Sequence, residues 1–278
     1  MGTPAVPVTQ FIEEYIASFE QDYSMLKIGC SKETLIKGNV ATFLVAGSGG
    51  ETAVTRGSNG YIPFKSPSNT QVSCTLNERH APFEMTGFDI FANQGDQRRI
   101  MMKAAQSVMH RDIDQAIIDQ LDTATVTTGS AATASLDLVN KAIVKLGNAE
   151  VPLTEEDKLF AAITPAFQAY LMQITEFASA DYVDVKPFAG PMKRARRWAG
   201  INWMVHPNLT GVGTSSEKCY LWHSLALGHA ANMAEMKVDA DYERKQQLSW
   251  TNATLYHNAK VLQTTGIVQM VHDGSAYA

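Results

Sequence analysis

The chain has 278 residues, of which 45% are hydrophobic and 18% are charged, and its formal net charge is −5. These values indicate a folded protein with a large core, and they exclude a mostly disordered chain or a strongly basic protein that coats nucleic acid. No apolar run approaches the roughly 20 residues that span a bilayer, and the first residues show no charged-then-apolar signal segment. We therefore expect no contact with a membrane and synthesis in the cytoplasm.

The first third of the chain predicts an arm followed by a long β-hairpin. Residues 1–10 contain two prolines, and residues 9–22 have the three- and four-residue apolar spacing of an amphipathic helix. Strands are predicted at 40–46 and at 72–77, where apolar and polar side chains alternate. The glycine-rich segment 47–60 between them has little to bury, and such a loop usually has a function or a partner. We therefore predict a hairpin whose tip contacts another molecule.

The clearest helix is predicted at residues 94–122, which contain no glycine or proline between Asp96 and Asp122. At ~1.5 Å per residue this helix would be roughly 40 Å long, about twice the ordinary length. Such a helix indicates the spine of an elongated structure. We assign its apolar stripe to two runs that are separated by a slip of one residue: Ile100, Ala104 and Val108, then Ile113, Ile117 and Leu121.

Beyond this helix the pattern is that of an α/β domain. Ser135 is predicted to cap a helix that runs through Leu146 and ends at Gly147. Residues 159–163 form an apolar run typical of a buried strand, and Thr164-Pro165 then begins another helix. Further strands are predicted at 201–205, 219–222, 238–247, 249–257 and 266–271.

No motif in the sequence predicts a catalytic or metal site. The glycine-rich segment lacks the Lys-Ser or Lys-Thr of a phosphate-binding loop, and Ser48 has Ala46 where a nucleophile elbow needs glycine. The histidines do not have the spacing of a helical zinc motif, and the three cysteines (Cys30, Cys74 and Cys219) form no CxxC pair. We expect no catalytic residue, no cofactor and no metal ion.

Charged side chains are the candidates for contacts between copies of the chain. On the hairpin these are Glu51, Arg56 and Lys65, because the tip has no core of its own. At the start of the long helix, Arg98 and Arg99 are assigned to a solvated face or to salt bridges with a neighbour. For a third, basic group, which precedes a tryptophan, an intersubunit ion-pair patch ranks first, a solvated turn second and contact with DNA third. This group comprises Lys193, Arg194, Arg196 and Arg197.

Four short phrases occur in the order found in one family. A strand leads into a proline-started helix at residues 159–165, and a glycine precedes a strand within 198–205. A strand runs into an H-x-x-A-L-G turn at 219–228, and 255–268 resemble the usual ending. With the arm, the hairpin and the long helix, these phrases resemble the major capsid proteins of tailed double-stranded DNA bacteriophages, which share the HK97-like fold. The resemblance covers nearly the whole chain.

The resemblance implies an α+β, HK97-like capsid fold. An N-terminal arm would occupy residues 1–39 and an extended β-hairpin loop residues 40–80. Residues 81–129 and 236–278 would form a peripheral domain that holds the spine helix, and residues 130–235 an α/β axial domain. We expect these boundaries to describe the folded subunit.

The resemblance also implies the partners. The protein would assemble with itself into hexamers and pentamers of the icosahedral head shell, which encloses the phage DNA, and would reside in the virion. A portal protein at one vertex, non-specific contact with packaged double-stranded DNA and a decoration protein are further implied partners. Only about 40 residues precede the hairpin, too few for a fused scaffolding domain, so a separate scaffolding protein is expected.

Three alternatives stay open at this point. One is a tail or decoration protein, although such proteins usually have more β-structure and lack a helix as long as 94–122. An encapsulin-type nanocompartment shell has the same fold and would need a cargo-binding groove near an N-terminal helix, for which residues 9–22 are available. A soluble α/β hydrolase or metal enzyme belongs to a different class and is supported only by the seven histidines.

Overall fold

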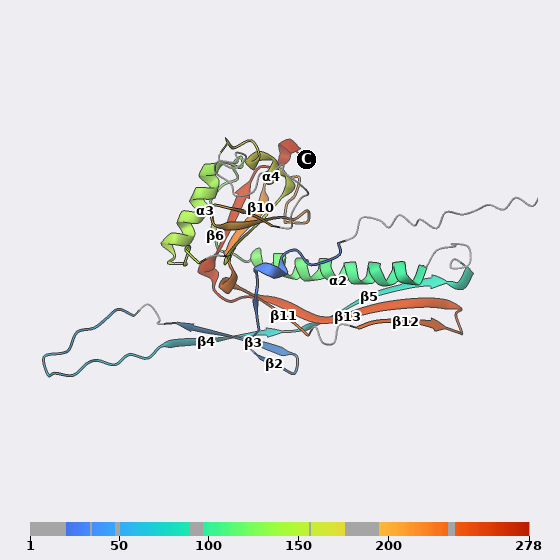
Figure 1. The fold of residues 1–278 in the computed structure, drawn as a ribbon, viewed down its shortest axis with the longest axis horizontal. Helices are drawn as coiled ribbons and strands as arrows, with labels where there is room; N and C mark the ends of the chain where they lie inside the picture. The colour runs from blue at the N-terminus through green and yellow to red at the C-terminus, as the bar shows by residue number, and fades with distance from the viewer. Residues whose placement is uncertain are drawn as a thin grey trace, which may run out of the picture. The chain divides into compact units, whose positions relative to one another are not determined.

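A computed structural model describes residues 21–33, 35–47, 51–88, 97–155, 157–175, 195–232 and 237–277 (Figure 1). The chain divides into two compact units. The first comprises residues 1–24, 78–112 and 232–256, and the second residues 25–77, 113–231 and 257–278. Nearly all of the helix expected at 9–22 lies outside the described residues, so that helix stays a prediction.

The first unit consists of strands and the N-terminal half of a long helix. Strand β12 (Lys237–Glu243) pairs antiparallel with β13 (Leu248–Val261), and β5 (Asn77–Thr86) also pairs with β13. Alternate side chains of β13 are buried over most of its length, as expected for a strand with one face on a core. Strand β5 was not predicted, because its sequence is mostly polar and contains Pro82.

Helix α2 (Gln97–Leu121) confirms the long helix, and the predicted residues 94–96 lie outside the described part of the chain. The assigned stripe is wrong in its first half, because Ile100, Ala104 and Val108 are only half-buried. Buried apolar side chains instead repeat every four residues along the whole helix, and Ser107, Asp114 and Ile118 are buried beside them. The repeating positions are Met101, Ala105, Met109, Ile113, Ile117 and Leu121. Because four residues advance by about 400° in an α-helix, this buried line winds around the helix, and a single-face reading misplaces it.

The second unit is built on a six-stranded sheet in the order β6-β14-β10-β7-β9-β8. Strand β7 is parallel to β9, and β10 is antiparallel to both β7 and β14. Helices α3 (Leu136–Asn148) and α4 (Pro165–Leu171) contribute buried side chains to the core of this sheet. The strands are β6 (Val126–Thr127), β7 (Leu159–Ile163), β8 (Arg196–Trp198), β9 (Ile201–Val205), β10 (Glu217–His223) and β14 (Ile267–His272).

The predicted cap of α3 is present, and the predicted start of α4 is capped as well. Oγ of Ser135 accepts a hydrogen bond from the backbone N–H of Leu138 at 3.4 Å, and Oγ1 of Thr164 accepts one from Phe167 at 3.2 Å. The predicted end of α3 is wrong by one to two residues: Gly147 lies inside the helix, and the C-cap is Ala149.

The second unit also contains short strands and 3-10 turns outside the six-stranded sheet. Strand β1 (Ser31–Lys32) pairs with β11 (Leu227–Ala231), which pairs with the end of β13. Strands β2 (Leu35–Lys37), β3 (Val40–Gly47) and β4 (Ser68–Thr75) form a three-stranded sheet. Short 3-10 turns complete the unit: η1 (Lys27–Gly29), η2 (Ser224–Ala226), η4 (Thr264–Gly266) and η5 (Ser275–Tyr277). None of the described helices has the length and apolar character needed to cross a membrane.

Candidate assembly surfaces

The predicted hairpin is present and is anchored at its base. Strands β3 and β4 pair in register from Val40↔Thr75 to Gly47↔Ser68. At the base, the ring of Phe43 packs against the backbone of Gly228, where a Cβ atom would lie 2.6 Å from the ring. This contact holds the hairpin on strand β11, and glycine at 228 is what permits it.

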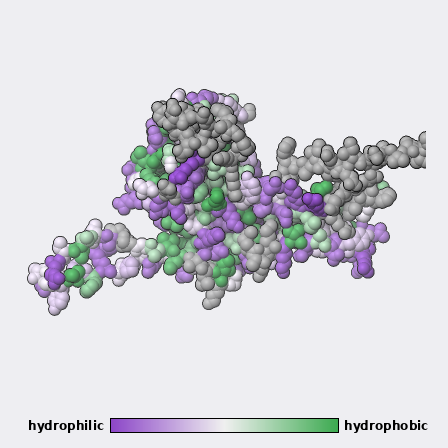
Figure 2. All heavy atoms as spheres, viewed as in Figure 1, coloured by the Kyte–Doolittle hydropathy of each residue, from purple (hydrophilic) through white to green (hydrophobic). Residues whose placement is uncertain are grey.

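The loop between β3 and β4 has no core of its own. Every residue from 51 to 71 is exposed, and the loop carries apolar side chains among polar ones (Figure 2). Phe64 is 97% exposed, Tyr61 75% and Ile62 49%. These large side chains leave apolar area of the loop exposed to water.

The charges of the loop are partnered within the loop. Lys65 forms an ion pair with Glu51 across it, and Nη1 of Arg56 donates a hydrogen bond to the carbonyl oxygen of Gly60 at 3.1 Å. The structure therefore brings Glu51 and Lys65 together, whereas the sequence had suggested them only as separate contacts with a neighbour. The exposed aromatic side chains, which the sequence reading did not select, are left uncovered.

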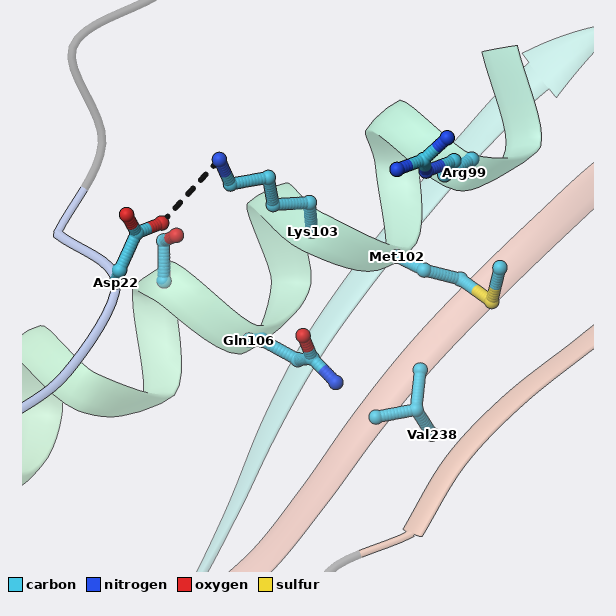
Figure 3. A pocket seen from close by; sticks show the side chains of 7 residues that line it. Asp22, Arg99, Met102, Lys103, Gln106 and Val238 are labelled. Carbon is cyan, nitrogen blue, oxygen red and sulfur yellow. Dashed lines mark ion pairs between the residues drawn. The ribbon is translucent and has the colours of Figure 1, made fainter. Parts of the chain in front are cut away.

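A groove lies along the N-terminal half of α2, in the first unit (Figure 3). Its volume is about 470 Å³. Met102 and Gln106 point toward Val238 of β12, and Lys103 points toward Asp22 (Figure 3). Nζ of Lys103 lies 3.3 Å from Oδ1 of Asp22. We call this feature the α2 groove.

Of the two arginines predicted at the start of this helix, the structure describes the side chain of only one. Arg99 lines the α2 groove and is exposed, while the side chain of Arg98 lies outside the described residues. Lys103 and Asp22 were not singled out from the sequence. Their spacing gives no signal, because residue 22 precedes the hairpin and residue 103 follows it.

The basic group before Trp198 is only partly described. Lys193 and Arg194 lie outside the described residues, as does the side chain of Arg196 in strand β8. Nη1 of Arg197 lies 3.6 Å from Oδ1 of Asp157 in the same chain. The tryptophan itself is only 8% exposed and packs in the core, so its ring does not offer a stacking platform for a nucleobase.

A cluster of hydrogen bonds that sequence reading missed fixes the end of α2 within the second unit. Asp122 accepts hydrogen bonds from Tyr220 Oη at 2.6 Å, Thr210 Oγ1 at 2.5 Å and Lys218 Nζ at 3.0 Å. Burial on its own raises the pKa of Asp122, but these three donors lower it below the ordinary value. The aspartate is therefore held charged and fixed in place.

Buried histidine pairs supply a second set of unpredicted contacts. Nε2 of His272 lies 2.7 Å from Oε2 of Glu217, which also accepts a hydrogen bond from Thr164 at 2.5 Å. Nε2 of His206 lies 3.4 Å from Oδ2 of Asp114. These pairs link distant segments of the second unit and are structural in character.

Among the described residues, no group of three or more His, Cys, Asp or Glu side chains could hold a metal ion. Burial raises the pKa of the Cys219 thiol to about 12 and also raises the pKa of Cys30 and Cys74, which leaves these thiols poor nucleophiles.

Solved structures with the same fold are known from several phages. The chain matches a protein of Mycobacterium phage Che8 with a TM-score of 0.72 and 18% identity, covering 97% of this chain and 98% of that one. It matches the capsid of cyanophage P-SCSP1u with a TM-score of 0.68 and 15% identity, covering 98% and 95%. It matches the capsid of Ralstonia phage GP4 with a TM-score of 0.69 and 10% identity, covering 98% and 97%. A comparison with curated proteins found no match.

The fold is that of the HK97-like class of phage capsid proteins. The chain belongs to the phage capsid protein family, whose sequence profile matches residues 4–273. It is the major capsid protein of a phage head shell, resides in the virion and is not an enzyme. This assignment favours the phage shell over the encapsulin-type alternative and over the hydrolase or metal-enzyme alternative.

Proposed function

We propose that this capsid protein tiles hexamers and pentamers of the head shell, with the β3–β4 hairpin as its main extension to neighbours. The observation that carries the proposal is the loop in which every residue from 51 to 71 is exposed. Phe64 and Tyr61 leave apolar area in water that no part of the subunit within the described ranges covers. A contact repeated around a ring and across a shell adds up through avidity, even when each contact is moderate.

Each domain of the expected fold has its own role in the shell. Residues 130–235 act as the axial domain and residues 81–129 with 236–278 as the peripheral domain, with α2 as its spine. Residues 1–39 act as the arm and residues 40–80 as the extended loop. The sheet and two helices of the second unit support a rigid axial wedge, because their core is continuous from α3 to β14. Strands β6 and β14 join this core from the segments assigned to the peripheral domain.

Other partners follow from the function of a head shell. A separate scaffolding protein, a portal protein at one vertex, packaged double-stranded DNA bound non-specifically and a decoration protein are proposed partners. The net charge of −5 supports a loose, non-specific contact with DNA, because an acidic shell does not bind its contents tightly.

The direct test is electron microscopy of the purified chain after light scattering, over a range of protein concentration and ionic strength. Closed shells, or rings of five and six subunits, are the expected result. A stable monomer or dimer under every condition, with or without a co-expressed scaffolding protein from a related phage, would contradict self-assembly.

The charged residues proposed for contacts between copies can be tested one at a time. Arg56→Glu reverses a charge on the exposed loop, and Arg244→Glu reverses one on the turn after β12 as a matched control. We expect Arg56→Glu to lower the yield of shells more than the control does, while urea unfolding of the subunit is unchanged. Equal yields would remove Arg56 from the contact. The same comparison applies to Glu51, Lys65, Arg98, Arg99, Lys193, Arg194, Arg196 and Arg197.

A further inference from the structure

We infer that Asn59, in the turn of the β3–β4 loop, is a site of spontaneous deamidation in the free subunit, and that assembly protects it. The backbone nitrogen of Gly60 attacks the side-chain amide of Asn59, and water completes the conversion of this amide to a carboxylate. The inference rests on the proposed function, in which a neighbouring copy covers the loop. It adds a chemical limit on how long a free copy stays able to assemble.

The sequence and the exposure of the turn favour this reaction. Asn59-Gly60 is the only Asn-Gly pair in the sequence. Glycine after asparagine favours attack, because it has no Cβ atom to obstruct the approach of its nitrogen to the side chain. Around Gly60, no atom beyond its chain neighbours lies within 4 Å of the position that a Cβ would take. Both residues are exposed, so water and hydroxide reach the reacting atoms.

The turn also holds the side-chain amide by its oxygen. Oδ1 of Asn59 accepts a hydrogen bond from the backbone N–H of Tyr61 at 3.3 Å. Negative charge develops on this oxygen when a nucleophile adds to the amide carbon, so the N–H of Tyr61 stabilises the intermediate as an oxyanion-hole donor does. Nη1 of Arg56 donates to the carbonyl oxygen of Gly60 at 3.1 Å, which places a positive charge close to the anion that forms.

The reaction consumes only water and releases ammonia. Hydroxide removes the proton from the nitrogen of Gly60, and this nitrogen forms a bond to Cγ of Asn59. The bond from Cγ to Nδ2 breaks, and Nδ2 leaves as ammonia after it takes a proton from water. Water then opens the cyclic succinimide at either of its carbonyl carbons, which gives aspartate or isoaspartate at this position. Because deprotonation comes first, the rate rises with pH.

Opening of the turn controls the reaction. The N–H of Gly60 donates to the carbonyl oxygen of Gly57 at 2.9 Å, and this bond must open before the nitrogen attacks. The N–H of Gly57 donates to the carbonyl oxygen of Tyr61 at 2.8 Å and closes the turn. Exposed turns of this kind open locally at little cost in free energy. A neighbouring copy that covers the loop raises this cost and excludes water, so we expect protection in the shell.

Deamidation changes the surface that the loop offers to a neighbour. Within residues 51–71 the charged side chains are one carboxylate, Glu51, and two cations, Arg56 and Lys65, so one added carboxylate takes the net charge of the loop from +1 to 0. Isoaspartate also adds a methylene carbon to the backbone, which disrupts the hydrogen bonds that close the turn. Both products therefore weaken the contact between copies.

Mass spectrometry of the peptide that contains Asn59 tests the reaction. Assembled shells, and chain kept below the concentration at which shells form, are incubated side by side. We expect the fraction of peptide with the mass of an acid in place of an amide to grow at least several-fold faster in the unassembled chain, and faster as the pH is raised. Asn69, which is exposed and is followed by Thr70, is the internal control and should stay an amide.

The outcomes separate this inference from the proposed function. An unchanged Asn59 in the unassembled chain, or modification of Asn69 at the same rate, would overturn the site. Equal rates in the chain and in the shell would overturn the protection. Failure of the unmodified chain to form shells at any concentration would instead count against the proposed function, while the reaction in the unassembled chain is measured independently of assembly.

Two substitutions test the consequence for assembly. Asn59→Asp carries the charge that the reaction makes, and Asn69→Asp places the same charge on strand β4 as the matched control. We expect Asn59→Asp to lower the yield of shells several-fold relative to the control, while urea unfolding of the two variants is the same. Equal yields would overturn the effect on assembly.

Asn59→Gln tests the limit on the free copy. Its longer side chain forms a larger ring that closes far more slowly, so the mass change should disappear. After storage as unassembled chain, this variant should keep its yield of shells while the unmodified chain loses a large part of its own. The same loss in both chains would show that deamidation of Asn59 is not the cause.

Discussion

The rings of His229 and His257 lie 5.7 Å apart on the paired strands β11 and β13, and both side chains are buried. Burial, with smaller contributions from His257 and Lys27, lowers the pKa of His229 to about 3, while Asp114 opposes the shift. The folded chain therefore takes up this proton only near pH 3, whereas the unfolded chain takes it up near pH 6.5. The stability that neutral His229 contributes is complete above pH 6.5 and is lost as the pH falls toward 3.

A His229→Gln variant should reduce this acid sensitivity. Between pH 6.5 and pH 4 we expect the free energy of unfolding to fall less steeply than in the unmodified chain, by up to about 1.4 kcal/mol per pH unit. Urea unfolding at several pH values measures the slope. The same substitution at the exposed His80 is the control and should leave the slope unchanged. Equal slopes for all three chains would show that His229 is not responsible.

Asp122 contributes stability with the same direction of pH dependence but over a lower pH range, because its folded pKa lies below its ordinary carboxyl value. Its contribution is present above about pH 4 and disappears as the pH falls through the folded value. Asp122→Asn should destabilise the chain by about 1–3 kcal/mol at pH 7, since three donors lose a charged acceptor. Asp119→Asn, on the exposed side of α2, is the control. A loss no greater than that of the control would contradict a structural role for this cluster.

At the scale of elements, the hairpin depends on a close approach between β3 and β11. Gly228→Ala would place a methyl group 2.6 Å from the ring of Phe43, closer than van der Waals contact allows. We expect this variant to lose about 1–3 kcal/mol of stability and to become more sensitive to proteolysis in the loop. Phe43→Leu combined with Gly228→Ala should recover part of the loss, because leucine makes room. If the two losses were additive, the contact would not be the cause.

Helix α2 was predicted in its extent, whereas its buried face was predicted correctly only from Ile113 to Leu121. Its extent was evident from a long stretch without glycine or proline. The buried line advances every four residues, so it winds around the helix from Met101 to Leu121. Different neighbours cover its two halves, and local periodicity does not reveal which side each neighbour takes.

At the scale of the whole molecule, stability and assembly should separate at Phe64. The side chain is 97% exposed, so Phe64→Ser should change the free energy of unfolding by less than about 0.5 kcal/mol. The same change should lower the yield of shells, because a docked loop loses its apolar anchor. Val144→Ser, at another exposed apolar position, is the control. Normal yield of Phe64→Ser shells, measured by light scattering and electron microscopy, would remove this residue from assembly.

The sequence by itself determined the features that depend on neighbouring residues. The strand at 159–163, the caps at Ser135 and Thr164 and the hairpin flanked by Val40 and Thr75 arise from patterns within a few positions. The order of these elements, together with the short sequence phrases between them, also indicated the capsid family. Local patterns suffice here because propensity, capping and alternation act over one or two turns.

Only the tertiary structure decided the contacts between distant segments. Lys65 pairs with Glu51 rather than standing free, Lys103 meets Asp22, and Tyr220 meets Asp122. Packing brings these groups together, and their spacing in the sequence does not predict the contacts. The exposure of Phe64 could not be predicted either, because the residue type alone does not distinguish a phenylalanine buried in the core of its own chain from one that a second copy covers. That difference is set by what the rest of the chain leaves uncovered.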